Sequence, residues 1–211
     1  MKWHSPLTLA FVVSLLTAPL PGGDWPQFRY DAGRTAAAPH ELPAELRLRW
    51  TRTLAAPRPA FPPEVRLGYD ASYEPVVLGR TMFVPSMVAD TVTALDTETG
   101  AERWRFITGG PVRFAPGAWE GKVYCVPDDG CLYGVNADDG SLRWKFRGLP
   151  EDRRDRWVLG NGRLVSLFPA RGGPVLADGV VYFAAGLWPT EGVFVHALDA
   201  ESGKAVWSNT D

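Results

Sequence analysis

Short runs in which apolar and polar residues alternate recur along most of the chain. In Arg103-Trp104-Arg105-Phe106 the rings occupy every second position, and Arg143-Trp144-Lys145-Phe146 repeats the pattern. A period of two places the rings on one face of a strand and the basic side chains on the other. The runs are short and bounded by glycine, proline and aspartate, so the pattern predicts many short β-strands.

A second kind of run begins with glycine and continues with β-branched and aromatic residues. It occurs at residues 79–84, 121–126 and 179–183. Each run is followed by an acidic turn and then by one of the tryptophan-containing strands. The order strand, glycine turn, strand, turn, strand, acidic turn, tryptophan strand therefore describes one four-stranded unit.

The acidic turns share one motif, in which Asp or Asn precedes Gly by four residues and Trp follows it by four. The three copies span residues 94–104, 135–144 and 197–207. The repeat residues are Asp96, Gly100, Trp104, Asn136, Gly140, Trp144, Asp199, Gly203 and Trp207. We predict that the Asp or Asn caps the turn, that Gly adopts a left-handed conformation, and that Trp packs against the neighbouring unit.

The spacing identifies the fold class. The first two glycines of the motif are 40 residues apart, and four antiparallel strands in about 40 residues make one blade of a β-propeller. A β-sandwich would have to produce three similar eleven-residue turns by chance. A Trp-Asp repeat propeller would show Gly-His and Trp-Asp signatures, which this chain lacks. The sequence thus predicts an all-β propeller of four-stranded antiparallel blades.

The motif resembles the tryptophan-docking repeat of the pyrroloquinoline quinone (PQQ) repeat family. The first and third copies match closely, whereas the second departs at Val135, Asn136 and Asp139. Residues 24–29, Asp-Trp-Pro-Gln-Phe-Arg, also resemble the opening of many exported members. The resemblance covers about residues 24–211.

Three blades are fewer than the four to eight of a closed ring. Trp50, within residues 46–52, resembles a tryptophan strand without a preceding motif, as expected of an N-terminal strand that closes the last blade of a propeller. We therefore expect an incomplete ring, the N-terminal part of a larger propeller, with open edges prone to association.

The N-terminus has the pattern of an export signal. Lys2 precedes an apolar run over residues 7–18, and prolines and glycines follow at once. This run is too short to span a bilayer comfortably. We expect a signal peptide over residues 1–23, a propeller over residues 24–211 in the periplasm or outside the cell, and no later transmembrane segment; a buried N-terminal helix is the alternative.

Charge and composition exclude few functions. The net charge is −2, which gives no reason to expect nucleic acid as a partner. Cys125 and Cys131 flank a turn, and their pairing stays open. The run from Glu151 to Arg156 reads as a solvated loop or as an arginine patch for an anionic partner, and the proline-rich residues 37–71 read as an irregular segment.

The resemblance implies two classes of function. One is a non-enzymatic binding or scaffold module for a protein or cell-envelope component, as in the propeller subunit of the outer-membrane barrel-assembly machinery. The alternative is the N-terminal part of a quinoprotein alcohol or sugar dehydrogenase, with PQQ and calcium on the propeller axis. Adjacent cysteines, found in many such dehydrogenases, are absent. We favour the first class and assign no catalytic, cofactor-binding or metal residue.

Overall fold

The computed structural model describes residues 23–61, 68–160 and 162–210. The part of the chain that it describes contains strands and no helix, which confirms the all-β prediction.

Three four-stranded antiparallel sheets follow one another, each with its strands in chain order. Blade 1 consists of β1 (Val76–Leu78), β2 (Thr81–Ser86), β3 (Thr91–Asp96) and β4 (Glu102–Ile107). Blade 2 consists of β5 (Gly117–Trp119), β6 (Lys122–Cys125), β7 (Cys131–Asn136) and β8 (Leu142–Arg147). Blade 3 consists of β11 (Val175–Ala177), β12 (Val180–Ala185), β13 (Phe194–Asp199) and β14 (Ala205–Asn209).

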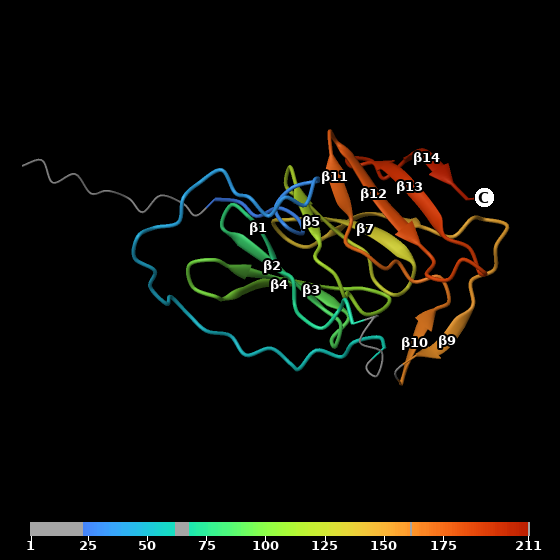
Figure 1. The fold of residues 1–211 in the computed structure, drawn as a ribbon, viewed down its shortest axis with the longest axis horizontal. Coiled ribbons are helices and arrows are strands. Elements are labelled where there is room, and N and C mark those ends of the chain that lie inside the picture. The colour runs from blue at the N-terminus through green and yellow to red at the C-terminus, as the bar shows by residue number, and fades with distance from the viewer. Residues whose placement is uncertain (1–22, 62–67, 161, 211) are drawn as a thin grey trace, which may run out of the picture.

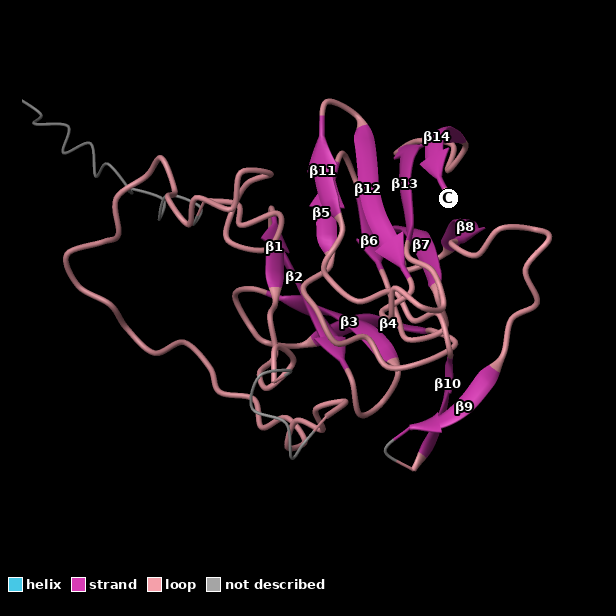
Figure 2. Cartoon of the chain, turned by 45° about the vertical axis from the view of Figure 1, so that its right-hand side comes forward, coloured by secondary structure: helices cyan, strands magenta, loops and turns pink. Residues whose placement is uncertain are grey.

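The blades pack face to face, and their apolar faces form the core (Figures 1 and 2). One buried cluster joins blade 1 to blade 2 and includes Phe83, Trp104 and Val123. A second joins blade 2 to blade 3 and includes Tyr124 and Leu198. Alternation along each strand supplies these faces, because every second side chain points to the same neighbouring sheet.

The acidic turns between the third and fourth strands are built alike. The carboxylate of Asp96 accepts hydrogen bonds from the backbone N–H groups of Glu98 and Thr99, at 2.9 and 3.0 Å. In blade 2 the side chain of Asn136 accepts the first of these bonds, from the N–H of Asp138, and in blade 3 that of Asp199 accepts the second, from the N–H of Ser202. The glycine that ends each turn has a φ of +69°, +72° or +69°, which a side chain would strain.

Tryptophan rings from the preceding part of the chain pack on these same glycines. The ring of Trp104 lies on Gly140 of blade 2, and its indole N–H donates to the carbonyl of Ala137 at 2.9 Å. Trp144 makes the equivalent contacts with Gly203 and Ala200 of blade 3. Blades 1 and 2 are thus each attached to the following blade by an indole that packs on a glycine and by one hydrogen bond.

Trp50 makes the same kind of contact, although it lies outside the three blades. Its ring lies on Gly100, and its indole N–H donates to the carbonyl of Thr97 at 2.9 Å. Residues 46–52 nevertheless form no strand. This differs from the expected N-terminal strand, since the described chain places no neighbouring strand beside the segment for a ladder to form. Trp50 makes the same contact as Trp104 and Trp144, but the predicted strand around it is not formed.

The segment after residue 23 crosses the inner strands of all three blades. Trp25 forms a β-bridge with Val77 of β1, and the carbonyl of Pro26 accepts a hydrogen bond from the N–H of Ala118 in β5, at 2.7 Å. The Gln27 side chain exchanges two hydrogen bonds with the backbone of Leu176 in β11. In a propeller the innermost strands line the central channel, so this opening motif lies on the axial side of the blades.

The long insertion between the second and third motif copies contains an element that the sequence did not reveal. Strands β9 (Trp157–Gly160) and β10 (Arg163–Ser166) form a separate hairpin that projects from the blades (Figure 2). Residues 151–154 before it are exposed, as a solvated loop should be. The described parts of residues 37–71 form no strand, in agreement with the predicted irregular segment.

Three further expectations concern the two cysteines, a transmembrane segment and the export signal. Cys125 and Cys131 are buried free thiols, and burial raises the pKa of Cys131 to about 12. The described chain contains no helix long and apolar enough to cross a membrane. The predicted export signal at residues 1–23 lies outside the described residues except for its last position.

Candidate functional site

The starts of the three inner strands surround one cavity. It has a volume of about 420 Å³, and we call it the axial cavity. Glu74 lies just before β1, Phe114 before β5, and Gly172 and Gly173 before β11. The remaining lining residues are Phe28, Arg34, Tyr69, Arg171 and Leu187. Equivalent positions of three blades thus converge on a space lined by three aromatic rings and three charged side chains, a combination of apolar and polar groups that is usual for a ligand site.

Glu74 is the carboxylate in the wall of the axial cavity. It is partly buried, and one of its oxygens accepts a hydrogen bond from the backbone N–H of Ala115 at 3.2 Å. Burial raises the pKa of the Glu74 carboxyl above its ordinary value, against the opposing effects of the Ala115 bond and of the Arg34 charge. A carboxyl shifted in this direction holds its proton closer to neutral pH and suits an acid or base role.

Two arginines provide positive charge in the same wall. The exposed Arg34 guanidinium lies over the ring of Phe28, 5.5 Å from its centroid. Arg171 is mostly buried and lies over the ring of Phe61 at 5.4 Å. Flat apolar surfaces next to guanidinium groups are suited to a planar, negatively charged ligand.

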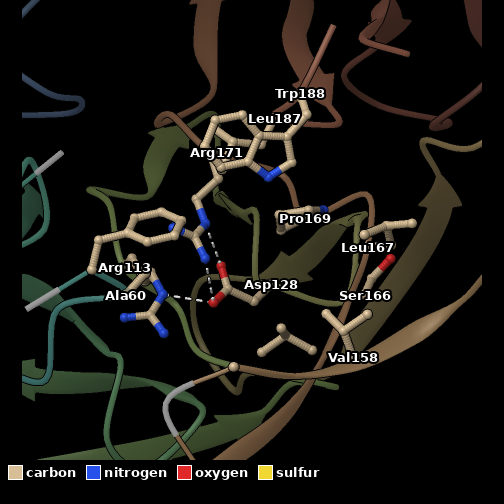
Figure 3. Close-up of a pocket in the computed structure, with 13 residues that line it drawn as sticks. Ala60, Arg113, Asp128, Val158, Ser166, Leu167, Pro169, Arg171, Leu187 and Trp188 are labelled. Atoms are coloured by element: carbon tan, nitrogen blue, oxygen red, sulfur yellow. Dashed lines mark hydrogen bonds and ion pairs between the residues drawn. The ribbon is translucent and has the colours of Figure 1, made fainter. Parts of the chain in front are cut away.

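Arg171 also lines a second, smaller cavity of about 130 Å³, which we call the arginine cavity (Figure 3). There Asp128 bridges two arginines. It accepts hydrogen bonds from Arg113 Nε at 2.6 Å and from Arg171 Nε at 3.0 Å. Arg113 also pairs with Asp70 at 2.9 Å. The side chains of Arg113 and Asp128 are 4% and 1% exposed, so the cluster is held in place by desolvated charges that depend on one another.

The β9–β10 hairpin forms one wall of the arginine cavity through Val158, Gly160 and Val165. It is anchored to blade 1 by Arg163, which donates hydrogen bonds to the carbonyls of Met87 and Val88 at 3.0 Å and pairs with Asp90. The insertion therefore connects the region after blade 2 to the β2–β3 turn of blade 1, and closes one side of the cavity.

The repeat residues named from the sequence lie at the opposite end of the blades. The turn that contains Asp96 follows β3, which runs in the same direction as β1, and Thr97 N–H bonds to the carbonyl of Arg80 in the β1–β2 turn. The cavities lie where the inner strands begin. The motif turns, and the tryptophans Trp50, Trp104 and Trp144 that dock on them, thus take no part in the candidate site. Among the described residues, no group of three or more His, Cys, Asp or Glu side chains could hold a metal ion.

Sequence reasoning missed Glu74, Arg113 and Arg171. A local signal did exist, since each lies within a few residues of the start of an inner strand, after the chain leaves the preceding blade or segment. The ion pairs among Asp70, Arg113, Asp128 and Arg171 join residues far apart in the chain, and no local pattern announces such contacts.

Two curated proteins match part of this chain. The alcohol dehydrogenase (quinone) dehydrogenase subunit of Gluconobacter oxydans (strain 621H) is 33% identical over 127 residues, which cover 54% of this chain and 16% of that protein. The corresponding subunit of Gluconacetobacter polyoxogenes is 30% identical over 146 residues, covering 63% of this chain and 19% of the relative. The matched region is thus less than a fifth of the length of each relative.

Solved structures support the fold. The quinohemoprotein alcohol dehydrogenase from Comamonas testosteroni superposes with a TM-score of 0.64 at 24% identity, covering 89% of this chain and 27% of that chain. A europium-containing methanol dehydrogenase gives a TM-score of 0.62 at 21% identity, covering 89% of this chain and 32% of that one. At these identities the likeness establishes the propeller architecture alone.

Residues 46–165 match the sequence model of the PQQ-repeat family that is described as outer membrane protein assembly factor BamB. The match covers more than half of the chain. It includes blades 1 and 2 and the β9–β10 hairpin except for the last residue of β10. Together with the three stacked blades and their tryptophan contacts, it shows that the chain belongs to the PQQ-repeat family of β-propellers.

Proposed function

We propose that this chain forms the first blades of a quinoprotein-type dehydrogenase propeller and that the axial cavity is its share of the ligand site. The observation that carries the proposal is the convergence of three inner strands on a cavity lined by aromatic rings, Glu74, Arg34 and Arg171. The matches to quinone-dependent alcohol dehydrogenase subunits favour this function over the non-enzymatic module.

The donor set of the cavity fits the organic cofactor of such enzymes. PQQ is a flat quinone with carboxylate substituents, so it requires apolar walls and cationic donors. Phe28 and Phe114 supply walls, and Arg34 and Arg171 supply guanidinium groups. The described residues offer no comparable set for calcium. When bound, the quinone would accept the electrons released on alcohol oxidation.

The chain's own contribution to that reaction would be a proton acceptor. Glu74 is the carboxylate in the wall of the cavity, and burial already raises its pKa. A partly desolvated carboxylate takes up a proton from an alcohol hydroxyl more readily than a fully hydrated one. The Ala115 N–H holds one of its oxygens in place, and the neighbouring arginines would orient the anionic ligand.

The test is a titration of the full chain with PQQ, with and without calcium, followed by tryptophan fluorescence and thermal shift. We expect saturable binding and a higher melting temperature. Arg34→Ala should weaken binding about tenfold, the effect of losing about 1.4 kcal/mol. Arg47→Ala, which removes an exposed arginine that pairs with Glu45, is the matched control. A folded chain that binds no PQQ would contradict the proposal.

The second candidate is the non-enzymatic binding or scaffold module. One observation favours it: Asp128 and Asp70 already neutralise the buried arginines, so part of the positive charge near the axis is not free for a ligand. If PQQ does not bind, we would favour this function, with a protein or cell-envelope component as partner. Both candidates place the chain outside the cytoplasm, because residues 1–23 have the pattern of an export signal.

A further inference from the structure

Residues 27–36 form a tightly folded loop in which four residues other than glycine have a left-handed backbone conformation. The φ angles are +55° at Arg29, +83° at Tyr30, +54° at Arg34 and +57° at Ala36. This region favours glycine, and it costs free energy in any residue that carries a Cβ. Such strain persists only where the surrounding contacts impose it, and it gathers at functional sites and ligand clamps.

Backbone hydrogen bonds fold the loop into two consecutive turns. The first turn spans residues 27–30 and the second residues 31–34, and each is closed by a bond of 2.9 Å from the N–H of its last residue to the carbonyl of its first. A third bond of 2.8 Å, from the N–H of Ala36 to the carbonyl of Arg29, ties the two turns together. The Gln27 side chain holds the start of the loop on blade 3.

The side chain of Asp31 closes the second turn from outside the backbone. One carboxylate oxygen accepts a hydrogen bond from the N–H of Thr35 at 2.9 Å, and the other accepts one from the Thr35 hydroxyl at 2.6 Å. These two bonds, the hydroxyl bond first, lower the pKa of the Asp31 carboxyl below its ordinary value, because they favour its charged form. Arg34 directly precedes Thr35, so the Asp31–Thr35 pair encloses the strained Arg34 backbone.

Arg34 extends from this loop to the axial cavity. Its guanidinium lies over the Phe28 ring, 5.5 Å from the centroid, and both side chains line the cavity. Its charge also acts on Glu74: burial raises the pKa of that carboxyl, and the Ala115 N–H bond and the Arg34 charge lower it. The position of one guanidinium thus affects both the charge offered to an anionic ligand and the proton affinity of Glu74.

We propose that Asp31 is a positioning residue for the axial cavity, which holds Arg34 in place through Thr35. With its backbone fixed, the Arg34 guanidinium is preorganised over Phe28, and less conformational entropy is lost when an anionic ligand binds to it. Asp31 is not among the residues that line the cavity, so it acts through its neighbours alone. The inference rests on the proposed function, in which Arg34 is a donor to the ligand.

The first measurement needs no ligand. It is the pKa of Glu74 in the full chain, from the NMR titration of its side-chain carboxyl carbon, with the signal assigned by the Glu74→Gln variant. Asp31→Ala should raise this pKa, as Arg34→Ala does, because the released guanidinium spends less time near the carboxyl. Loss of the Asp31 charge by itself would lower the Glu74 pKa, so the sign of the shift separates the two effects.

The second measurement is the affinity for PQQ, followed by tryptophan fluorescence. Asp31→Ala should weaken binding about threefold, a part of the about tenfold loss expected for Arg34→Ala. The double variant Asp31→Ala/Arg34→Ala should bind no more weakly than Arg34→Ala, because residues that act through one another are not additive. Thr35→Val should shift both measurements as Asp31→Ala does, and Thr35→Ser, which keeps the hydroxyl donor, should restore them.

Asp139→Ala is the matched control. The Asp139 carboxylate accepts hydrogen bonds from the N–H and the hydroxyl of Ser141, at 2.8 and 2.6 Å, so this substitution removes the same charge and the same kind of pair from a turn of blade 2. It should leave the Glu74 pKa and the PQQ affinity unchanged, and circular dichroism melts should show all variants folded.

The proposal is overturned if Asp31→Ala lowers the Glu74 pKa or leaves it unchanged. It is also overturned if the double variant loses affinity by the product of the two single effects. If the chain binds no PQQ but Asp31→Ala raises the Glu74 pKa, the proposed function fails and the positioning role of Asp31 stands.

Discussion

At the scale of single residues, the glycines of the motif have two roles in the fold. Gly100, Gly140 and Gly203 have positive φ values, and a Cβ at each would lie 2.4–2.6 Å from the indole that rests on it. The sequence indicated the first requirement but not the second. The close approach of the ring is what makes the turn a docking site, so these positions combine backbone conformation with packing between blades.

Gly121 and Gly140 allow the two requirements to be separated. Both have a φ of +72°, but a Cβ at Gly121 would meet nothing within 4 Å, whereas one at Gly140 would meet the Trp104 ring. Gly121→Ala should cost about 1–2 kcal/mol, the price of a left-handed alanine. Gly140→Ala should cost at least about 1 kcal/mol more, as overpacking does. Urea unfolding of both variants measures the difference in the free energy of unfolding. Equal losses would mean that the Trp104 ring moves aside at no cost in stability.

At the scale of elements, the three blades repeat one plan, and the β9–β10 hairpin is an addition to it. The blades follow from alternation and glycine turns, which the sequence displays. The hairpin contains no copy of the motif, and its anchor is a long-range contact from Arg163 to the β2–β3 turn of blade 1. Its position over the arginine cavity makes it the part of the site most easily altered without disturbing the blades.

Arg163→Ala should therefore release the hairpin while the blades stay folded. The substitution removes two hydrogen bonds to the Met87 and Val88 carbonyls and the ion pair with Asp90. We expect amide hydrogen exchange in residues 157–160 and 163–166 to rise about tenfold, as for an element opened locally. Exchange in β2 and β3 should change little.

Arg154→Ala, an exposed position in the same insertion, is the control and should leave exchange in the hairpin unchanged. If Arg163→Ala also leaves the hairpin protected, the anchor lies in the contacts of Ser166 and Phe168 with the β6–β7 turn instead.

At the scale of the whole molecule, buried carboxyls affect how stability depends on pH. Burial raises the pKa of Asp129, against the effect of the Tyr133 hydroxyl that donates to it; burial also raises the pKa of Asp90 and of Glu74. A folded chain that keeps such protons to higher pH than the unfolded chain binds more protons in that window. The contribution of these three carboxyls to stability therefore falls as the pH rises above the ordinary carboxyl range of about 4.

Asp129→Asn tests this dependence, because an amide does not titrate. Asp129 lies in the interface between blades 1 and 2, where a Cβ on Gly109 would touch it. Between pH 4 and pH 7 the unmodified chain should lose more free energy of unfolding than the variant does, whatever their absolute stabilities. Urea denaturation at several pH values provides the measurement. Asp138→Asn, at an exposed turn, should keep the original slope, and an unchanged slope in Asp129→Asn would refute the assignment.

The sequence by itself determined the blades. Alternation, glycine turns and the Asp-x-x-x-Gly motif are local, and strand pairing between neighbours in the chain follows from them. The motif likewise identified Trp104 and Trp144 as residues that pack against the next blade, whereas the strand predicted around Trp50 is not formed.

Only the tertiary structure decided the candidate site. Glu74, Phe114 and Gly172 come together because three inner strands begin at the same end of the molecule, and Asp128 meets Arg113 and Arg171 across two blade connections. Such contacts depend on how whole sheets are oriented, which no stretch of sequence encodes locally.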